Sequence, residues 1–270
     1  MLSITSKSKI RPYLLTLLLI PVSLIATAQK EAGDIDWKSW KVDIPVDGIS
    51  KIIEGKDIKK ALSSGEYREY FKENSNSTIE LLSSYLGATG KDAFGNKKLN
   101  YSSSELVEVF YDKKSDYKEY WTNSGRHILE SRMKAYKVKG SPETCIARII
   151  GIDKNGASYD KIRILWTDGY IFADVNSNES GDGQYKQTRI AKVDNNMFDI
   201  ALKMIDGRVS LSIYCKDSDV DKKNFPIAEF RDTEFSQNLF RIGNYFNNSK
   251  GTEDAVVVQI KYVMLTHSKN

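Results

Sequence analysis

Short alternating segments, separated by turn residues, run from about residue 78 to the end of this 270-residue sequence. Apolar residues recur at every second position within them, which is the period of a β-strand with one buried face. Many short strands of this kind predict an all-β sandwich or barrel. The segments are 78–87, 104–111, 127–138, 144–153, 161–175, 197–215, 239–246 and 255–265.

Two Asp-Gly pairs mark the sharpest turns between these segments. Asp168-Gly169 lies in "WTDGY", and Asp206-Gly207 lies in "MIDGRV". Asp-Gly accepts the positive φ angles of a two-residue turn, so we expect a hairpin at each pair. The charged stretch at 55–75 predicts one short helix near "DIKKALSSGEYREYF".

The alternation also assigns side chains to the two faces of each strand. Three strands then place charged or polar groups on one face among smaller residues, as a sheet with a solvated, concave face would. The expected sides are Ser103, Glu105 and Val107 opposite Ser104, Leu106 and Glu108; Ile146, Arg148 and Ile150 opposite Cys145, Ala147 and Ile149; and Leu239, Arg241, Gly243, Tyr245 and Asn247 opposite Phe240, Ile242, Asn244 and Phe246.

The first 28 residues have the pattern of an export signal. Lys7, Lys9 and Arg11 form a basic start, an apolar run follows at 13–25, and Ala26-Thr27-Ala28 is a small-residue cleavage site. A membrane anchor is the alternative, but the run is short for a span and a proline interrupts it.

These features divide the chain into three parts. We expect a signal peptide at 1–28, cleaved near Ala28, an exposed lead-in at 29–50 and one domain at 51–270. The mature protein would then be secreted or periplasmic.

The charge of the mature chain excludes one broad class of partner. Forty basic residues less the three in the leader leave 37, against 36 acidic residues, a net charge of +1. Such a chain lacks the basic excess of a nucleic-acid-binding protein, so nucleic acid is not an expected partner. No long apolar stretch follows the leader, so we expect no membrane contact in the mature form, which we take to be a monomer.

Cysteine and histidine are too scarce to suggest a metal site. Cys145 and Cys215 stand 70 residues apart, and export would permit a disulfide without establishing one, so their pairing stays open. His127 and His267 are the only histidines, and no Cys/His cluster is visible. We expect no metal and no cofactor, a structural hydrogen bond at His127, and no role for His267 near a terminus that should fray.

Three segments resemble the strand motifs of the alginate lyases of polysaccharide lyase family seven, which are secreted β-jelly-roll enzymes acting on acidic polysaccharide. The motifs that line the groove of that family are R-[ST]-E-L-R, Q-[IV]-H and Y-F-K-A-G-x-Y-x-Q. They correspond here to "SSELV" at 103–107, "RII" at 148–150 and "LFRIGNYFN" at 239–247. The resemblance covers some two-thirds of the chain, from "YLGATG" onward, and implies a β-jelly-roll sandwich of two antiparallel sheets with a concave substrate groove.

The sequence departs from these motifs at most of the polar positions. Glu105 and Leu106 of the first motif match the family, as do Gly243 and Tyr245 of the third. The arginines of the first motif are replaced by Ser103 and Val107, the glutamine and histidine of the second by Arg148 and Ile150, and the tyrosine, lysine and glutamine of the third by Leu239, Arg241 and Asn247.

A polyuronate lyase removes the C5 proton of a uronate and expels the 4-linked sugar oxygen. The carboxylate must be neutralised so that the enolate can form, a base must take the proton, and an acid must protonate the leaving oxygen. In the family, glutamine and arginine hold the carboxylate, while histidine and the last tyrosine serve as base and acid, or the tyrosine does both. Only that tyrosine is retained, as Tyr245, because Ile150 cannot transfer a proton.

The resemblance therefore implies a reduced catalytic set. Tyr245 would act as acid and base, Arg148 and Arg241 would neutralise the carboxylate, and Arg241 would stabilise the phenolate. Glu105 and Asn247 would position the substrate. Other interpretations stay open: Tyr245 could only stack a sugar or pack its strand, Arg148 could only pair with Glu105, and Asn247 could be a turn residue.

The leading hypothesis is a secreted polysaccharide lyase that cleaves an alginate-like, uronate-containing polysaccharide by β-elimination. The competing class is a catalytically inactive lyase-like domain that binds acidic glycan, and a third is a purely structural exported β-sandwich. We expect Trp121 and Trp166 in the core or at its rim rather than on a sugar platform.

Overall fold

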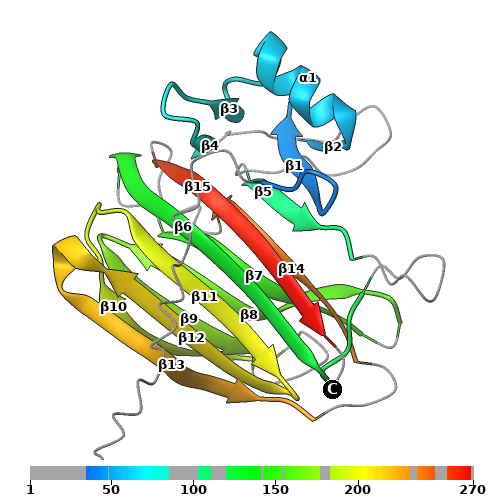
Figure 1. Cartoon of the computed structure of the whole chain (residues 1–270), viewed down its shortest axis with the longest axis vertical. Helices are drawn as coiled ribbons and strands as arrows, with labels where there is room; N and C mark the ends of the chain where they lie inside the picture. Colours follow the sequence, from blue (N-terminus) through cyan, green and yellow to red (C-terminus); the bar gives the residue numbers. More distant parts are fainter. Residues whose placement is uncertain are drawn as a thin grey trace, which may run out of the picture.

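The computed structural model of the chain consists of two antiparallel β-sheets packed face to face (Figure 1). We call the eight-stranded sheet the front sheet and the seven-stranded sheet the back sheet. The predicted all-β sandwich is thereby confirmed. The structure describes residues 35–47, 49–84, 103–110, 120–140, 143–153, 155–176, 183–231, 236–246 and 254–268.

The front sheet has the strand order β10-β9-β8-β7-β14-β5-β1-β2. The three motif segments lie on β7, β14 and β5, which are neighbours near the middle of this sheet. In sheet order the strands are Tyr185–Lys192, Tyr170–Asn176, Ser158–Thr167, Glu143–Ile152, Gln237–Phe246, Ser103–Glu108, Trp40–Val46 and Ile49–Glu54.

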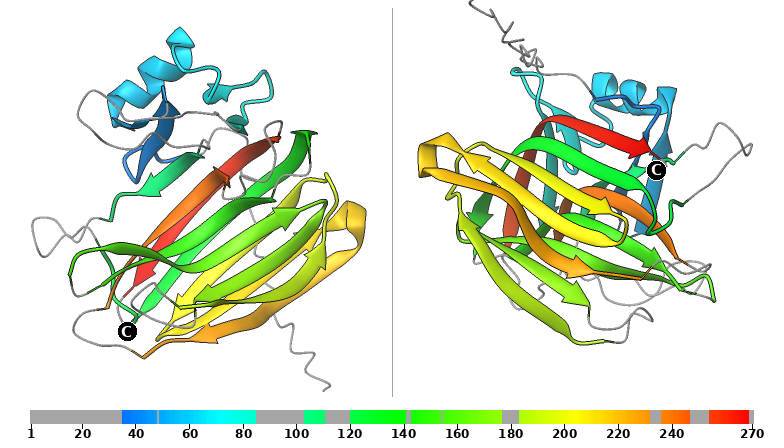
Figure 2. Two further views of the ribbon diagram at one scale, coloured as in Figure 1. Left: turned by 180° about the vertical axis from the view of Figure 1, so that it is seen from behind. Right: turned by 60° about the horizontal axis from the view of Figure 1, so that its bottom comes forward.

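The back sheet has the order β13-β12-β11-β6-β15-β4-β3, and its long strands β6 and β15 cross the molecule side by side (Figure 2). No helix in the described part of the chain is long and apolar enough to cross a membrane. In sheet order the strands are Val220–Glu229, Arg208–Cys215, Phe198–Ile205, Arg126–Lys139, Ala255–Ser268, Ile79–Ser84 and Phe71–Glu73.

Both predicted hairpins are confirmed. Asp168 and Gly169 join β8 to β9 with φ angles of 46° and 85°, and Asp206 and Gly207 join β11 to β12 with φ angles of 47° and 78°. Positive φ at both central residues is the geometry that matches the twist of the flanking strands. The Asp-Gly pairs therefore set the register of these two hairpins.

The predicted helix is confirmed as α1, Lys56–Ser64, which ends at Gly65 in the left-handed conformation. It lies beside β1 and β2, outside the two stacked sheets (Figure 1). Its buried residues, Ile58 and Ala61, are three positions apart and so share one face of the helix.

The segment expected to be an exposed lead-in differs from that expectation within its described part. Residues 40–46 form β1, an inner strand of the front sheet between β5 and β2. Trp40, Val42 and Ile44 are almost completely buried. The alternation of apolar and polar residues in β1 was not recognised in the sequence, because polar residues surround this strand. The expected signal peptide at 1–28 lies outside the described residues.

The core lies between the two sheets and is built from alternate residues of their strands. Trp121 and Trp166 are 2% and 1% exposed, so both pack in the core as expected. Burial of such large side chains is the main favourable term in folding. Other large buried side chains there include Trp40, Phe71, Phe198 and Phe240.

A β-bulge in β7 changes the face assignment predicted for residues 145–150. Cys145 pairs with Leu165 and Ala147 with Ile164, so Ile146 is an extra residue on β7. Ile146 joins the core with Ala147, whereas Cys145 does not belong to the core cluster. The predicted alternation is therefore wrong at Ile146 and Cys145, because a bulge lets two successive residues take the same side.

The two cysteines are free and buried. Cys145 lies on β7 of the front sheet, while Cys215 is a core residue on β12 of the back sheet. Burial raises the pKa of the Cys145 thiol well above its ordinary value, which keeps it neutral. The open question of a disulfide is thus answered by two separate thiols.

Gly243 sits where β14 of the front sheet lies close to β4 of the back sheet. Its φ of +150° is one that side-chain-bearing residues rarely adopt. A Cβ there would lie 2.6 Å from the Ser104 carbonyl oxygen and 2.8 Å from Leu81 Cδ1. Only glycine fits between β5 and β4 at this point.

Replacing Gly243 with alanine should lower the free energy of unfolding by about 2 kcal/mol or more, because backbone strain and crowding act together. Urea unfolding would measure it. Gly156→Ala is the matched control, since Gly156 has φ +81° but open space around its Cβ position. A Gly243→Ala variant no less stable than Gly156→Ala would contradict the close approach.

Candidate functional site

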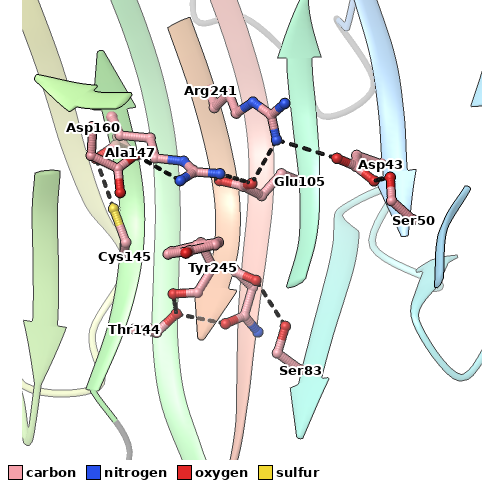
Figure 3. Close-up of polar contacts among 12 residues, drawn as sticks. Asp43, Ser50, Ser83, Glu105, Thr144, Cys145, Ala147, Asp160, Arg241 and Tyr245 are labelled. Carbon is pink, nitrogen blue, oxygen red and sulfur yellow. Dashed lines mark hydrogen bonds and ion pairs between the residues drawn. The ribbon is translucent and has the colours of Figure 1, made fainter. Parts of the chain in front are cut away.

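A row of charged side chains crosses the outer face of the front sheet, the face turned away from the back sheet (Figure 3). Five neighbouring strands, β1, β5, β14, β7 and β8, contribute one residue each. We call this row the charged ladder; its members are Asp43, Glu105, Arg241, Arg148 and Asp160.

Arg148 is the more enclosed of the two arginines in the ladder. Its Nε donates to Glu105 Oε1 at 2.9 Å, its Nη2 donates to Glu105 Oε2, and its Nη1 donates to Asp160 Oδ1 at 2.7 Å. Arg148 is 5% exposed and Glu105 is 1% exposed. Burial alone would lower the pKa of Arg148, but Glu105 and Asp160 raise it above its ordinary value.

Arg241 is the more accessible arginine. Its Nη1 lies 3.2 Å from Asp43 Oδ2 and 3.3 Å from Glu105 Oε2, so one nitrogen serves two carboxylates. Ser50 Oγ donates to the other oxygen of Asp43 at 2.6 Å. The Arg241 side chain is 25% exposed, and its Nη2 makes no hydrogen bond with any described residue. This nitrogen is available to a ligand.

Tyr245 stacks on Arg148. The guanidinium carbon lies 3.9 Å from the centre of the tyrosine ring, and the tyrosine is partly exposed. A guanidinium over an aromatic face is an attractive cation–π contact. The stack therefore joins Tyr245 to the charged ladder.

Side-chain hydrogen bonds around Asn244 fix the strand that carries Tyr245. Asn244 points inward, where its Nδ2 donates to the carbonyls of Leu81 at 3.0 Å and Val256 at 2.9 Å in the back sheet. Thr144 Oγ1 donates to Asn244 Oδ1 at 2.6 Å, and Ser83 Oγ donates to its carbonyl at 2.8 Å (Figure 3). These bonds hold the neighbouring Tyr245 on the outer face.

The structure brings together four of the five site residues expected from the sequence: Glu105, Arg148, Arg241 and Tyr245. Asn247 lies outside the described residues. Sequence reasoning missed Asp43 and Asp160, which hold the two arginines from opposite sides. Asp160 directly precedes the segment 161–175 that alternation assigned to a strand, and Asp43 lay in the segment assigned to the lead-in.

An apolar cluster continues the outer face beside the charged ladder. It consists of Val107, Ile150, Ile152 and Leu239, with Tyr120 packed against it. Three of these, Val107, Ile150 and Leu239, stand where the family motifs have arginine, histidine and tyrosine. At the position where the resemblance would place a proton-transferring histidine, this chain has the apolar side chain of Ile150.

Both histidines lie in a buried cluster elsewhere. His267 Nε2 is 2.7 Å from Glu108 Oε1, and the Nδ1 atoms of His267 and His127 are 2.8 Å apart. His127 Nε2 contacts the Ser124 carbonyl at 2.8 Å. The hydrogen bond expected at His127 is confirmed. The expectation that His267 lies in a frayed terminus without a role is wrong. His267 belongs to strand β15, Ala255–Ser268, and contacts Glu108.

Glu108 anchors this cluster. Its Oε2 accepts from Trp121 Nε1 at 2.9 Å and from the Phe240 amide at 2.6 Å. The two imidazoles make their close contacts with Glu108, with Ser124 and with each other, away from the outer face.

Within the described residues, no group of three or more histidine, cysteine, aspartate or glutamate side chains is arranged to hold a metal ion. The described residues of the outer face offer the chemistry of a tyrosine hydroxyl beside two guanidinium groups. Such a set can stack a ring, hold an anion and move a proton.

Replacing Glu105 with glutamine should lower the free energy of unfolding by about 3 kcal/mol, because Arg148 and Arg241 would lose their shared carboxylate in a buried site. Denaturant unfolding would measure the loss. Glu54→Gln is the control: it breaks the exposed Lys41–Glu54 pair, at 3.1 Å, and should cost less than about 1 kcal/mol. Equal effects of the two changes would contradict the role given to Glu105.

The histidine cluster should make stability depend on pH. Burial lowers the pKa of the His127 imidazole. As the pH falls, this imidazole is therefore protonated in the unfolded chain before it is protonated in the folded one. The contribution of His127 to the free energy of unfolding should therefore be greatest above about pH 6.5 and decrease as the pH drops below that value. Unfolding curves at several pH values would show this slope, and His127→Gln, which cannot titrate, should flatten it. An identical slope in the variant would overturn the assignment.

Solved structures of alginate lyases share this fold. Alginate lyase A1-II′, a member of polysaccharide lyase family-7, is 17% identical with a TM-score of 0.64, over 87% of this chain and 97% of that one. An alginate lyase from Pseudomonas aeruginosa is 16% identical with a TM-score of 0.64, over 87% of this chain and 100% of that one. An alginate lyase from Klebsiella pneumoniae is 13% identical with a TM-score of 0.61, over 87% and 97%.

These likenesses identify the sandwich as the β-jelly roll of such lyases, confirming the predicted fold. No curated protein sequence matches the chain significantly. The alginate lyase family model, however, matches residues 35–267, which is most of the sequence. The chain therefore belongs to the alginate lyase family, a family of polysaccharide lyases.

Proposed function

We propose that this chain is a secreted polysaccharide lyase that cleaves an alginate-like, uronate-containing polysaccharide by β-elimination. The observation that carries the proposal is the stack of Tyr245 on Arg148, 3.9 Å from ring centre to guanidinium carbon, within the charged ladder. The export pattern at 1–28 supports secretion or a periplasmic location, and the family supports an acidic polysaccharide as substrate. We take the mature protein to be a monomer without cofactor.

Tyr245 serves in this proposal as both base and acid. Its phenolate takes the C5 proton of the uronate, the C4–oxygen bond breaks as the C4–C5 double bond forms, and the phenol returns the proton to the leaving oxygen. One group on one side of the sugar suffices when the proton and the leaving oxygen lie on that same side. The chain has only two histidines, and both are bound in the Glu108 cluster.

The two arginines take different parts. All three nitrogens of Arg148 already donate to carboxylates, so contact with a substrate carboxylate would require the release of Glu105 or Asp160. Its geometry favours a positioning role, in which the guanidinium holds the ring of Tyr245 and stabilises the negative phenolate. Arg241, whose Nη2 makes no hydrogen bond with a described residue, is the better candidate to neutralise the substrate carboxylate.

Glu105 and Asn247 complete the proposed site. Glu105 binds both arginines and so sets their spacing beneath the substrate rather than touching it. Asn247, two residues beyond Tyr245 on the same side of the alternation, is proposed to contact a sugar hydroxyl.

An inactive glycan-binding domain is the second candidate. The apolar cluster at Val107, Ile150 and Leu239 favours it, because three polar positions of the family motifs are hydrocarbon here. Such a protein would bind acidic polysaccharide through Tyr245 and Arg241 without breaking it. Retardation of the polymer in affinity gels without new unsaturated ends would identify this function.

Tyr245→Phe should reduce the rate of unsaturated-product formation by about a hundredfold or more, because phenylalanine keeps the ring but cannot transfer a proton. The ultraviolet absorbance of unsaturated uronate ends measures this on alginate blocks, glucuronan, ulvan and glycosaminoglycans. Tyr214→Phe, an exposed tyrosine of the back sheet, is the control and should retain full activity. Undiminished activity of Tyr245→Phe would rule out the proposed mechanism.

A further inference from the structure

A second tyrosine–arginine stack lies on the outer face of the front sheet. The guanidinium carbon of Arg163, on β8, lies 3.7 Å from the ring centre of Tyr185, on edge strand β10. Arg163 Nη2 donates to Asp174 Oδ2 on β9 at 2.7 Å. A carboxylate clamps this arginine and a tyrosine covers it, as at Arg148.

The two stacks are adjacent and physically linked. Arg163 and Arg148 are directly opposite each other in the pairing of β8 with β7, so their side chains share the outer face. Asp160 contacts both stacks: its carboxylate accepts from Arg148 at 2.7 Å, and its main-chain carbonyl accepts from the Tyr185 hydroxyl at 3.2 Å. The arginines beneath the two tyrosine rings therefore lie on neighbouring strands, β7 and β8, about 4.8 Å apart. Asp160 joins the two stacks into one rigid unit.

The second stack has the means to bind a sugar. Tyr185 is 36% exposed, although one side of its ring rests on Arg163. A tyrosine ring offers an apolar surface to the C–H side of a pyranose and keeps a polar edge in water. Arg163 Nη1 makes no hydrogen bond with a described residue, so it can donate to a hydroxyl or carboxylate of the same sugar.

A purely structural role explains less of this geometry. A tyrosine that only shielded Arg163 would be expected to bury its ring, because burial is what stabilises a packed aromatic side chain. Tyr185 instead remains open on an edge strand, where five successive residues from Tyr185 to Arg189 are exposed. The ring is held in place by two contacts and left uncovered.

We propose that Tyr185 and Arg163 form a second sugar-binding position beside Tyr245, so that the ligand is a polysaccharide whose chain crosses from β14 over β7 and β8 toward β10. This inference rests on the proposed function, because it extends the same site. It assigns binding at the second position chiefly to the ring face of Tyr185, with Arg163 as a hydrogen-bond donor.

The test is calorimetric titration of an alginate hexasaccharide into the Tyr245→Phe protein, in which turnover is blocked. Tyr185→Leu in that background should weaken binding about tenfold, because the stacking surface is lost. Tyr185→Phe keeps the ring and should stay within about twofold of the parent. Tyr214→Leu, on the back sheet, is the matched control and should bind like the parent. Thermal unfolding would verify that each variant is folded.

Three results would overturn the inference: unchanged affinity of folded Tyr185→Leu, an equal loss in Tyr185→Phe and Tyr185→Leu, or no binding by the parent protein. The experiment separates this inference from the lyase assignment. Binding that depends on the Tyr185 ring, in a wild-type protein that forms no unsaturated ends, would support the second position and contradict the lyase. Formation of unsaturated ends, with affinity independent of Tyr185, would do the opposite.

Discussion

The buried ion pair between Arg148 and Glu105 is the contact on which the outer face of this protein depends. Both side chains are almost fully enclosed, and both Glu105 oxygens are engaged by Arg148. A buried pair is costly to form and far more costly to break on one side, so it fixes its surroundings rather than adding much net stability. Asp160, Arg241 and Tyr245 each take their position from this pair.

The ladder also changes what chemistry the face can perform. Each described arginine in it is matched by carboxylates, and both histidines of the chain are bound to Glu108 or its neighbour between the sheets. Neither histidine therefore stands beside Tyr245 on the outer face. What remains is a tyrosine held on a cation, with Arg241 as the accessible positive group.

Local patterns predicted most of the fold. The Asp-Gly pairs gave both hairpins because positive φ is a property of those residues themselves. Alternation correctly placed Glu105 opposite Leu106 and Arg241 opposite Ile242, since the pairing of β5 with β14 is regular there. It failed at Ile146, where a bulge adds a residue that nothing in the local sequence marks. The strand at 40–46 was missed because polar residues around it mask its alternation, although it pairs with both β2 and β5.

The site was predictable only in part. The motif strands identified Glu105, Arg148, Arg241 and Tyr245, but the ion partners Asp43 and Asp160 come from other strands, and His267 reaches Glu108 from the end of the chain. Such contacts are set by sheet order, which alternation does not specify.

The central claim is that Arg148 acts through Tyr245 rather than on the substrate. The most direct test is the pH dependence of kcat/KM for Arg148→Lys, which keeps the charge but loses the planar stack and the bidentate pair. If the claim holds, the acidic limb of the profile moves to higher pH while KM changes little, because the phenolate is less well stabilised. A raised KM with an unshifted limb would show instead that Arg148 binds the substrate carboxylate directly, and would contradict this account.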